Sequence, residues 1–256
     1  MEFAIINGRR EVPTPRCRGT CPVCGEPVLA KCGSKIVWHW SHGSNRHCDP
    51  WWENETVWHR DWKACFPEAQ REVVHFDVTG EKHVADVQTA RGMIIEFQNS
   101  PMPPDELRGR ERFYGKMIWI VNGASFKDRF HILDSLPDPR SEFARDLVFD
   151  RQTVESLGSG FWRKSENPAW SGPNDLVRAH RMREIETEIA KNYRGHHRFD
   201  WQRPRDVWYA ATVPVFFDFG GPTLCRLLPY DDRGLRCVRR VGKRDLVAKN
   251  GGTYAA

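Results

Sequence analysis

Residues 71–100, REVVHFDVTGEKHVADVQTARGMIIEFQNS, carry the pattern that decides the fold of this chain. Three extended runs follow one another in this stretch, and glycine-containing turns at residues 79–80 and 91–92 separate them. Short runs of this kind, joined by tight turns, predict a three-stranded meander. The predicted strands are Arg71–Val78, His83–Thr89 and Met93–Gln98.

Acidic and amide side chains occupy matching places in this meander. Asp86 lies in the second strand, while Glu96 and Gln98 are two apart in the third and therefore point to the same face. Because adjacent antiparallel strands can bring all three together, we expect a hard, oxygen-rich site that suits Mg²⁺ or Mn²⁺. Asp86 and Glu96 also fit ordinary outward positions on a half-solvated sheet, but apolar neighbours surround each of them, and a carboxylate there favours a compensating cation.

The flanking segments extend the predicted domain on both sides. Aromatic residues at helical spacing predict a helix over Trp51–Phe66, which Pro67 ends, and a second helix is expected from Pro103 to about Gly115. A strand over Met117–Val121 follows, so the order is helix, three strands, helix, strand. Farther along we expect a linker, a helix and a strand, over Gly158–Pro173, Asp175–Tyr193 and Val213–Phe219.

Five of the eight cysteines fall between Cys17 and Cys48. The string Cys21-Pro-Val-Cys24-Gly25 has the spacing of a zinc knuckle, and a segment of about 40 residues rarely holds itself together without a metal or a disulfide. A tetrahedral site needs two further ligands, and our preferred set is Cys21, Cys24, His42 and Cys48. His39 paired with His42 is the alternative, and His47 is also near. The spacing alone does not choose between these arrangements.

Composition sets broad limits on the class of protein. The formal net charge of +5 suits a polyanionic partner without requiring one, and the 11 tryptophans are expected to fill the core more than to stack on bases. The sequence shows no secretory apolar region and no membrane span, so we expect a cytoplasmic protein with reduced thiols. Proline and glycine residues mark candidate boundaries in the chain, and they predict three segments, 1–50, 51–157 and 158–256.

Taken together, several strings resemble the competence protein CoiA family, whose members are similar to PD-(D/E)xK nucleases fronted by a cysteine and histidine module. The resemblance covers about Cys21 to Val121, and loosely Pro214 to Leu228. The matching strings are Cys21-Pro-Val-Cys24, His39-Trp-Ser-His42, Cys48, Glu53-Asn-Glu55 with His59 and Lys63, Ala85-Asp86-Val87, Ile95-Glu96-Phe97-Gln98-Asn-Ser100, Arg112, Tyr114 and Trp119-Ile120.

The resemblance implies an α/β, restriction-endonuclease-like core of mixed sheet flanked by helices, with a zinc module before it and a C-terminal α+β extension after it. It implies that Asp86 and Glu96 bind a catalytic Mg²⁺ or Mn²⁺ and that Gln98 stands where a lysine is usual. Glu55 and His59 are expected to contribute from the preceding helix. The chain departs from the nuclease pattern at Ala85, where proline is usual, and at Gln98.

Other side chains are expected to meet the substrate. Lys63 would neutralise the DNA backbone or assist catalysis in place of the missing lysine, and Arg112 would contact nucleic acid, although a solvated charged face explains such arginines equally well. His59 would protonate a leaving oxygen, or would simply pack the helix.

The resulting hypothesis is a metal-dependent nuclease that hydrolyses phosphodiester bonds of DNA in DNA processing, uptake and recombination, or phage defence. Two other classes of protein fit the same residues. One is a catalytically inactive nucleic-acid-binding protein, and the replacement of lysine by Gln98 favours it. The other is a zinc-stabilised interaction module of a larger assembly.

Overall fold

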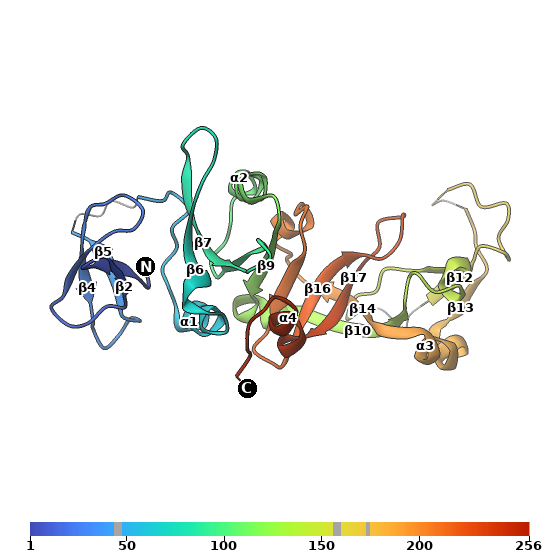
Figure 1. Ribbon diagram of the computed structural model, residues 1–256. Helices are drawn as coiled ribbons and strands as arrows, with labels where there is room; N and C mark the ends of the chain where they lie inside the picture. The colour runs from blue at the N-terminus through green and yellow to red at the C-terminus, as the bar shows by residue number, and fades with distance from the viewer. Residues whose placement is uncertain (44–47, 156–159, 173–174, 256) are drawn as a thin grey trace. The chain divides into compact units, whose positions relative to one another are not determined.

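The computed structural model describes residues 1–43, 48–155, 160–172 and 175–255. The chain forms a mixed α/β fold in which mixed and antiparallel sheets carry flanking helices (Figure 1). It divides into two compact units, each built from segments that are distant in sequence. Unit 1 comprises Met1–Asn122, Val207–Val215 and Lys243–Ala256, and unit 2 comprises Gly123–Asp206 and Phe216–Gly242.

Unit 1 begins with a five-stranded antiparallel sheet in the order β2-β1-β3-β4-β5. Its core is small and contains Ala4, Cys21, Val23, Val28 and Trp40. A core of this size buries little apolar area, which is the situation in which a bound metal adds stability. The strands are β1 (Ala4–Ile6), β2 (Arg9–Glu11), β3 (Arg18–Thr20), β4 (Pro27–Lys31) and β5 (His39–His42).

The rest of unit 1 confirms the predicted order of helix, three strands, helix and strand. β6 pairs with β7 and β7 with β8 in antiparallel fashion, whereas β8 and β9 are parallel because α2 crosses between them. All five residues of β8 are buried, as expected for a central strand covered on both faces. The elements are α1 (Val57–Ala64), β6 (Arg71–Phe76), β7 (Lys82–Gln88), β8 (Ile94–Gln98), α2 (Pro104–Tyr114) and β9 (Met117–Asn122).

The first helix is shorter than the sequence predicted. It begins at Val57 rather than Trp51, because the Thr56 hydroxyl accepts a hydrogen bond from the His59 backbone N–H and caps the helix there. The aromatic spacing that suggested a longer helix instead reflects packing. Trp62 of α1 stacks on Phe97 of β8 with ring centroids 5.7 Å apart, whereas Trp51 lies outside the helix and stacks on His83 of β7.

Unit 2 contains an antiparallel sheet in the order β10-β14-β17-β16 with β15 beside β16, and a three-stranded sheet β11-β12-β13. A buried cluster that includes Leu136, Phe149, Ile189 and Tyr230 forms a core in this unit. The strands are β10 (Phe130–Pro137), β11 (Leu147–Phe149), β12 (Gly160–Arg163), β13 (Ala179–Arg181), β14 (Tyr193–Trp201), β15 (Val215–Asp218), β16 (Thr223–Pro229) and β17 (Arg236–Gly242).

Two further α-helices complete the chain, α3 (Glu186–Asn192) in unit 2 and α4 (Lys243–Lys249) in unit 1. Short 3-10 helices lie between the larger elements. Their bounds are η1 (Glu68–Gln70), η2 (Ala124–Arg129), η3 (Phe143–Asp146), η4 (Met182–Ile185) and η5 (Asp206–Tyr209). No helix among the described residues is long and apolar enough to cross a membrane.

The helix predicted over Asp175–Tyr193 is wrong for most of its length. Ala179–Arg181 instead pairs with β12, and only Glu186–Asn192 is α-helical, because cross-strand pairing overrides the helical pattern. Part of the predicted linker is also a strand, β12, while residues 158, 159 and 173 lie outside the described residues. The strand predicted over Val213–Phe219 is confirmed as β15.

The two units differ from the three consecutive segments expected from the sequence. The boundary falls after Asn122, and the last segment of the chain returns to unit 1. There the Thr253 N–H donates to the Cys65 carbonyl, and Tyr254 lies against Trp62. Domain boundaries predicted from proline and glycine positions always give consecutive segments. They therefore cannot predict that a late segment packs against an early one.

Candidate functional site

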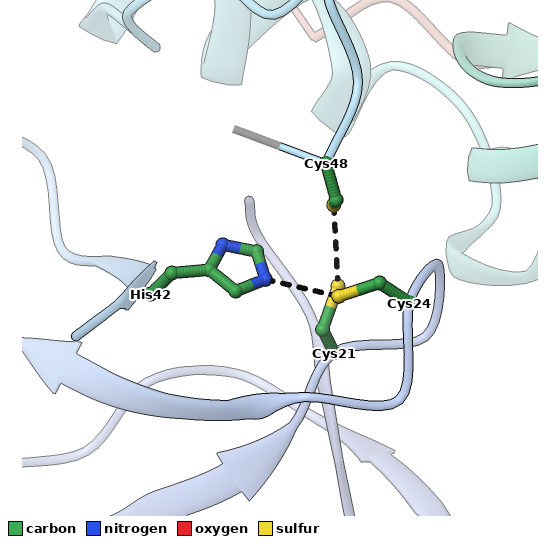
Figure 2. A group of neighbouring side chains, drawn as sticks. All are labelled: Cys21, Cys24, His42 and Cys48. Atoms are coloured by element: carbon green, nitrogen blue, oxygen red, sulfur yellow. Dashed lines mark hydrogen bonds between the residues drawn. The ribbon is translucent and has the colours of Figure 1, made fainter. Parts of the chain in front are cut away.

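Four side chains of the N-terminal module converge on one point: Cys21, Cys24, His42 and Cys48 (Figure 2). Their ligand atoms all lie within 4.8 Å of one another. The Sγ atoms of Cys21 and Cys48 are 3.7 Å apart, and the Cys24 Sγ is 3.2 Å from the Nε2 of His42. Ligand atoms about 3.3–3.8 Å apart are what a tetrahedral zinc ion with ordinary bond lengths requires. The cluster could therefore bind zinc.

The turn between the first two cysteines positions both sulfur atoms. Gly25 has a φ of 77°, which a residue without a side chain adopts at little cost, and its N–H donates to the Cys21 carbonyl at 3.0 Å. The Val23 N–H points at the Cys21 Sγ from 3.4 Å. Backbone N–H groups directed at sulfur favour the thiolate, the form of cysteine that binds metal.

The preferred ligand set from the sequence is the one that the structure brings together. His42 and the buried Trp40 lie on one face of β5, and His39 lies on the other, with its Nδ1 2.8 Å from the Val37 carbonyl. The alternative pair of His39 and His42 is therefore not assembled. His47 lies outside the described residues.

Burial and, after it, the neighbouring Cys21 sulfur together raise the pKa of the Cys48 thiol to about 12. Burial likewise raises the pKa of Cys21. Three sulfur atoms held this closely repel one another once they are ionised, and a divalent cation removes that repulsion. The donor set and its charge both fit a metal ion of the zinc class.

A second group of polar side chains lies where β7 and β8 separate. The register pairs Val87 with Ile95, so Asp86 and Glu96 stand opposite each other one residue farther along. At that point, hydrogen bonds from backbone N–H groups to carboxylates take the place of the backbone–backbone hydrogen bonds between the two strands. The Asp86 N–H donates to the Glu96 carboxylate at 3.1 Å, and the Phe97 N–H donates to the Asp86 carboxylate at 2.9 Å. The two acids therefore share one face of the sheet, as predicted.

Both carboxyl groups are short of compensating charge. Burial and, after it, the charge of the adjacent Asp86 raise the pKa of Glu96 to about 8 despite the opposing effect of Arg110. Burial also raises the pKa of Asp86, although Lys63 and His59 act against it. A pair of adjacent acids with raised pKa values is a common feature of binding and catalytic sites.

These acids line a cavity of about 300 Å³ in unit 1. In the part of the chain that the structure describes, the cavity wall holds six carboxyl groups against the permanent cations Lys63 and Arg110. His42 and Cys48 of the sulfur cluster also face this cavity. An excess of negative charge in an enclosed space attracts a cation. The six acids are Asp49, Glu53, Glu55, Glu72, Asp86 and Glu96.

Comparison with known families bears on the N-terminal module. Residues 15–50 match the family model of the competence protein CoiA, N-terminal domain. The match ends just after Cys48, so it contains the whole sulfur cluster, and we refer to these residues as the CoiA-type module. No curated protein and no solved structure matches the chain.

His59 is held at the edge of the cavity by a residue that the sequence analysis left out of the site. Its Nε2 lies 3.2 Å from a Glu53 carboxylate oxygen and 3.1 Å from the Phe97 carbonyl. Burial lowers the pKa of His59, but the hydrogen bond to Glu53 and the charges of Asp86 and Glu53 outweigh burial and raise it overall. His59 is therefore disposed to carry a proton near neutral pH.

Glu53 also organises the chain that leaves β8. Its carboxylate accepts hydrogen bonds from the N–H groups of Asn99 and Ser100, at 3.2 and 2.6 Å. The string Glu53-Asn-Glu55 contains both acids. In a helix that begins at Trp51, however, Glu55 shares a face with His59 and Lys63, so the pattern favours Glu55 over Glu53.

Glu55 and Lys63 have a different setting from the one expected. Glu55 precedes the helix, and it forms ion pairs with Lys63 and with Arg60, the latter at 2.7 Å. Lys63 is only 2% exposed and also pairs with Glu72 at 2.9 Å. Burial lowers the pKa of Lys63, but the charges of Glu72 and Glu55 outweigh it and raise the pKa. Lys63 is thus an interior cation facing the cavity, which corrects its assignment to the DNA-contacting surface.

Gln98 does not line the cavity that contains Asp86 and Glu96. Its amide nitrogen donates to Glu53 at 3.3 Å and to the Ser100 carbonyl at 3.2 Å. Gln98 therefore contacts the cavity wall through Glu53, and its role beside the acids stays a prediction. Its Oε1 is buried and has no hydrogen-bond partner among the described residues.

Among the arginines of α2, Arg110 is the one that reaches the site. It is buried, pairs with Glu96 at 3.0 Å and with Glu106 at 2.5 Å, and donates to the Trp51 carbonyl. Arg112 is exposed on the same helix, as a nucleic-acid contact would require. The spacing of Leu107, Arg110 and Glu111 along one helical face could have identified Arg110 as inward-facing.

Proposed function

We propose that this chain is a Mg²⁺- or Mn²⁺-dependent nuclease that hydrolyses phosphodiester bonds of DNA, in DNA processing, uptake and recombination, or phage defence. The observation that carries the proposal is the pairing of Asp86 and Glu96. The buried Glu96 and the half-buried Asp86 stand side by side in a cavity whose wall holds more carboxyl groups than permanent cations. Oxygen ligands of this kind suit a hard divalent cation.

In this proposal Asp86, Glu96 and the carbonyl of Phe97 hold the ion. When bound, the metal would polarise the scissile phosphate and lower the pKa of a water molecule bound to it. His59, kept protonated by Glu53, donates a proton to the leaving oxygen. Arg110 holds the Glu96 carboxylate in place, and Lys63 offsets the charge of Glu55 and Glu72. Gln98 acts only through Glu53, which it contacts.

We further propose that the CoiA-type module binds a structural zinc ion through Cys21, Cys24, His42 and Cys48. Four protein ligands leave no coordination position for a substrate, so the role of this ion is to stabilise the module. Because His42 and Cys48 also face the acidic cavity, the ion would fix one of its walls.

The nuclease proposal is tested by incubating purified protein with linear, circular and single-stranded DNA in Mg²⁺ or Mn²⁺. Asp86→Asn and Glu96→Gln remove one charge each with little change in shape, and Glu68→Gln removes an exposed carboxylate of the same unit. We expect both site variants to lose cleavage by more than the roughly 10- to 100-fold that loss of an outer partner of a metal site costs. Glu68→Gln should cut like the wild type.

One observation favours a second candidate, a nucleic-acid-binding protein that does not cleave. Lys63 is already paired with acids, and Gln98 lies off the cavity wall, so neither is placed to assist an attacking water. DNA binding by the wild type without cleavage in either metal would support this reading. A zinc-stabilised interaction module would instead show neither binding nor cleavage and would change size only with a protein partner.

A further inference from the structure

Three basic side chains form a row across the large sheet of unit 2. The register places His196 of β14 opposite Arg239 of β17, and Arg239 opposite Arg226 of β16. Side chains directly opposite one another on paired strands share a face, with Cβ atoms about 4.5–5.5 Å apart. The three strands run side by side (Figure 1). The row is therefore a continuous basic strip.

In the part of the chain that the structure describes, the charge of this row has no ion-pair partner. Among the described residues, no salt bridge joins a carboxylate to Arg226, Arg239 or Arg140, which lies just after β10. The Nε of Arg226 and the Nδ1 of His196 are buried and lack any hydrogen-bond partner in the described chain. Buried polar atoms without partners cost free energy, and a bound ligand would supply the partners that these two lack.

Arg140 lies just after β10, the strand beside β14, and its charge acts on two members of the row. Burial lowers the pKa of Arg226, and the charges of Arg239 and Arg140 lower it further. Burial also lowers the pKa of His196. Arg239, His197 and Arg140 add to that effect, and Asp138 opposes it. Like charges gathered around two unpartnered donors define a site that is completed by an anion.

Other contacts hold these side chains without neutralising them. The Nε of Arg239 donates to the Arg194 carbonyl at 3.0 Å, and the guanidinium of Arg226 lies 5.7 Å from the Phe216 ring centroid. Arg198 of β14 provides a contrast, because it pairs with Asp134 at 3.2 Å. Guanidinium groups that are held in place in this way still have N–H groups without acceptors among the described residues. Such groups match the oxygens of a phosphate group.

We propose that His196, Arg226 and Arg239 form a phosphate-binding site on unit 2. A row across three strands about 4.8 Å apart spans roughly 10 Å, which exceeds one phosphate group. A polynucleotide backbone, which offers several phosphates in line, therefore binds the strip more tightly than inorganic phosphate does. This site is independent of the proposed cleavage, because it requires neither Asp86 nor Glu96.

The test measures binding of the full chain to a labelled single-stranded oligonucleotide by fluorescence anisotropy, without added Mg²⁺ and at several salt concentrations. The test variant is Arg226→Gln/Arg239→Gln. The matched control, Arg145→Gln/Arg183→Gln, removes two exposed arginines of the same unit. We expect the test variant to bind about tenfold more weakly or worse. The slope of log affinity against log salt should fall by about 0.7 for each phosphate that the variant no longer neutralises. The control should keep the wild-type slope.

A second experiment measures the effect of inorganic phosphate on thermal stability. Phosphate should raise the melting temperature of the wild type above that in chloride of equal ionic strength, and the test variant should lose this response. The single variant Arg239→Gln, at an exposed position, serves if the double variant does not fold. A phosphate response without oligonucleotide binding would support the site and assign it to a small phosphorylated molecule. Unchanged affinity and slope in the test variant, or a phosphate response that survives in it, would overturn the proposal.

Discussion

At the scale of single residues, Glu96 links the pH of the solution to the stability of the fold. Its pKa in the folded chain is about 8, against an ordinary value of 4.5, so between these values the folded state holds a proton that the unfolded state has lost. Stability therefore falls as pH rises through this window. In Glu96→Gln, we expect the fall to be smaller by about 5 kcal/mol at most, because about 1.4 kcal/mol accompanies each pKa unit and the pKa rises from 4.5 to about 8.

The measurement is chemical denaturation of the metal-free wild type and Glu96→Gln at a series of pH values. Mn²⁺ should restore stability to the wild type at high pH and have less effect on the variant. Stability curves that run parallel across the whole range would show that Glu96 is not the residue responsible.

Lys63 makes a different prediction, because its partners are buried with it. In Lys63→Met, Glu55 and Glu72 keep their charges but lose the cation between them. We expect a loss of about 3–5 kcal/mol in the free energy of unfolding, the usual cost of removing one partner of a buried ion pair. Adding Glu72→Gln should recover part of the loss, whereas Lys249→Met, at an exposed site on α4, should cost little. Normal stability with weaker DNA binding would instead return Lys63 to the surface role.

The sequence predicted the neighbourhood of Asp86 and Glu96, because strand register and alternation decide which faces two residues share. It did not predict Glu53, Arg110 or the true setting of Lys63. Those positions depend on where α1 begins and on which face of α2 turns inward, and both are decided by tertiary packing. The set Cys21, Cys24, His42 and Cys48 was preferred correctly, although spacing left His39 open until the face of β5 was known.

At the scale of elements, the N-terminus of α1 decides how the site is assembled. The Thr56 hydroxyl caps the helix by accepting from the His59 N–H, and the same oxygen lies 2.9 Å from the His59 Nδ1, which donates to it when the ring is protonated. Thr56→Ala should therefore cost about 1 kcal/mol of stability. It should also loosen His59, which would appear as a change in the His59 titration measured by NMR.

Thr56→Ser keeps the hydroxyl and should retain both properties. Thr187→Ala, at an exposed position inside α3, is the control for loss of a helical threonine that is not at the cap position. Equal stability in Thr56→Ala and the wild type would mean that packing of Trp62 alone sets the start of α1.

Elements with strong local signals were predicted well. The meander β6–β8, the proline start of α2 and the strand β9 all fall within one or two residues of their expected limits. The predicted helix over Asp175–Tyr193 was mostly wrong because β13 takes its hydrogen bonds from β12, a strand that lies within a segment read as linker. Pairing between distant segments leaves no local trace in the sequence.

At the scale of the whole molecule, the CoiA-type module is expected to depend on its metal. One zinc ion should be released per chain when the thiols are modified, as measured with a chromogenic chelator, and the module should become sensitive to proteolysis because its own core is small. Cys24→Ser should lose the ion and the protection, while Cys32→Ser, outside the cluster, should keep both. Metal-free protein with an intact, protease-resistant module would contradict this.

The return of Lys243–Ala256 to unit 1 has a consequence for synthesis. The chain leaves the ribosome from its N-terminus, so the CoiA-type module and the strands around Asp86 emerge long before the segment that covers Trp62 and bonds to Cys65. Unit 2, by contrast, has its last strand available earlier. Unit 2 can thus have all its strands while unit 1 still lacks Lys243–Ala256, so unit 1 closes after unit 2 although the CoiA-type module emerges before it.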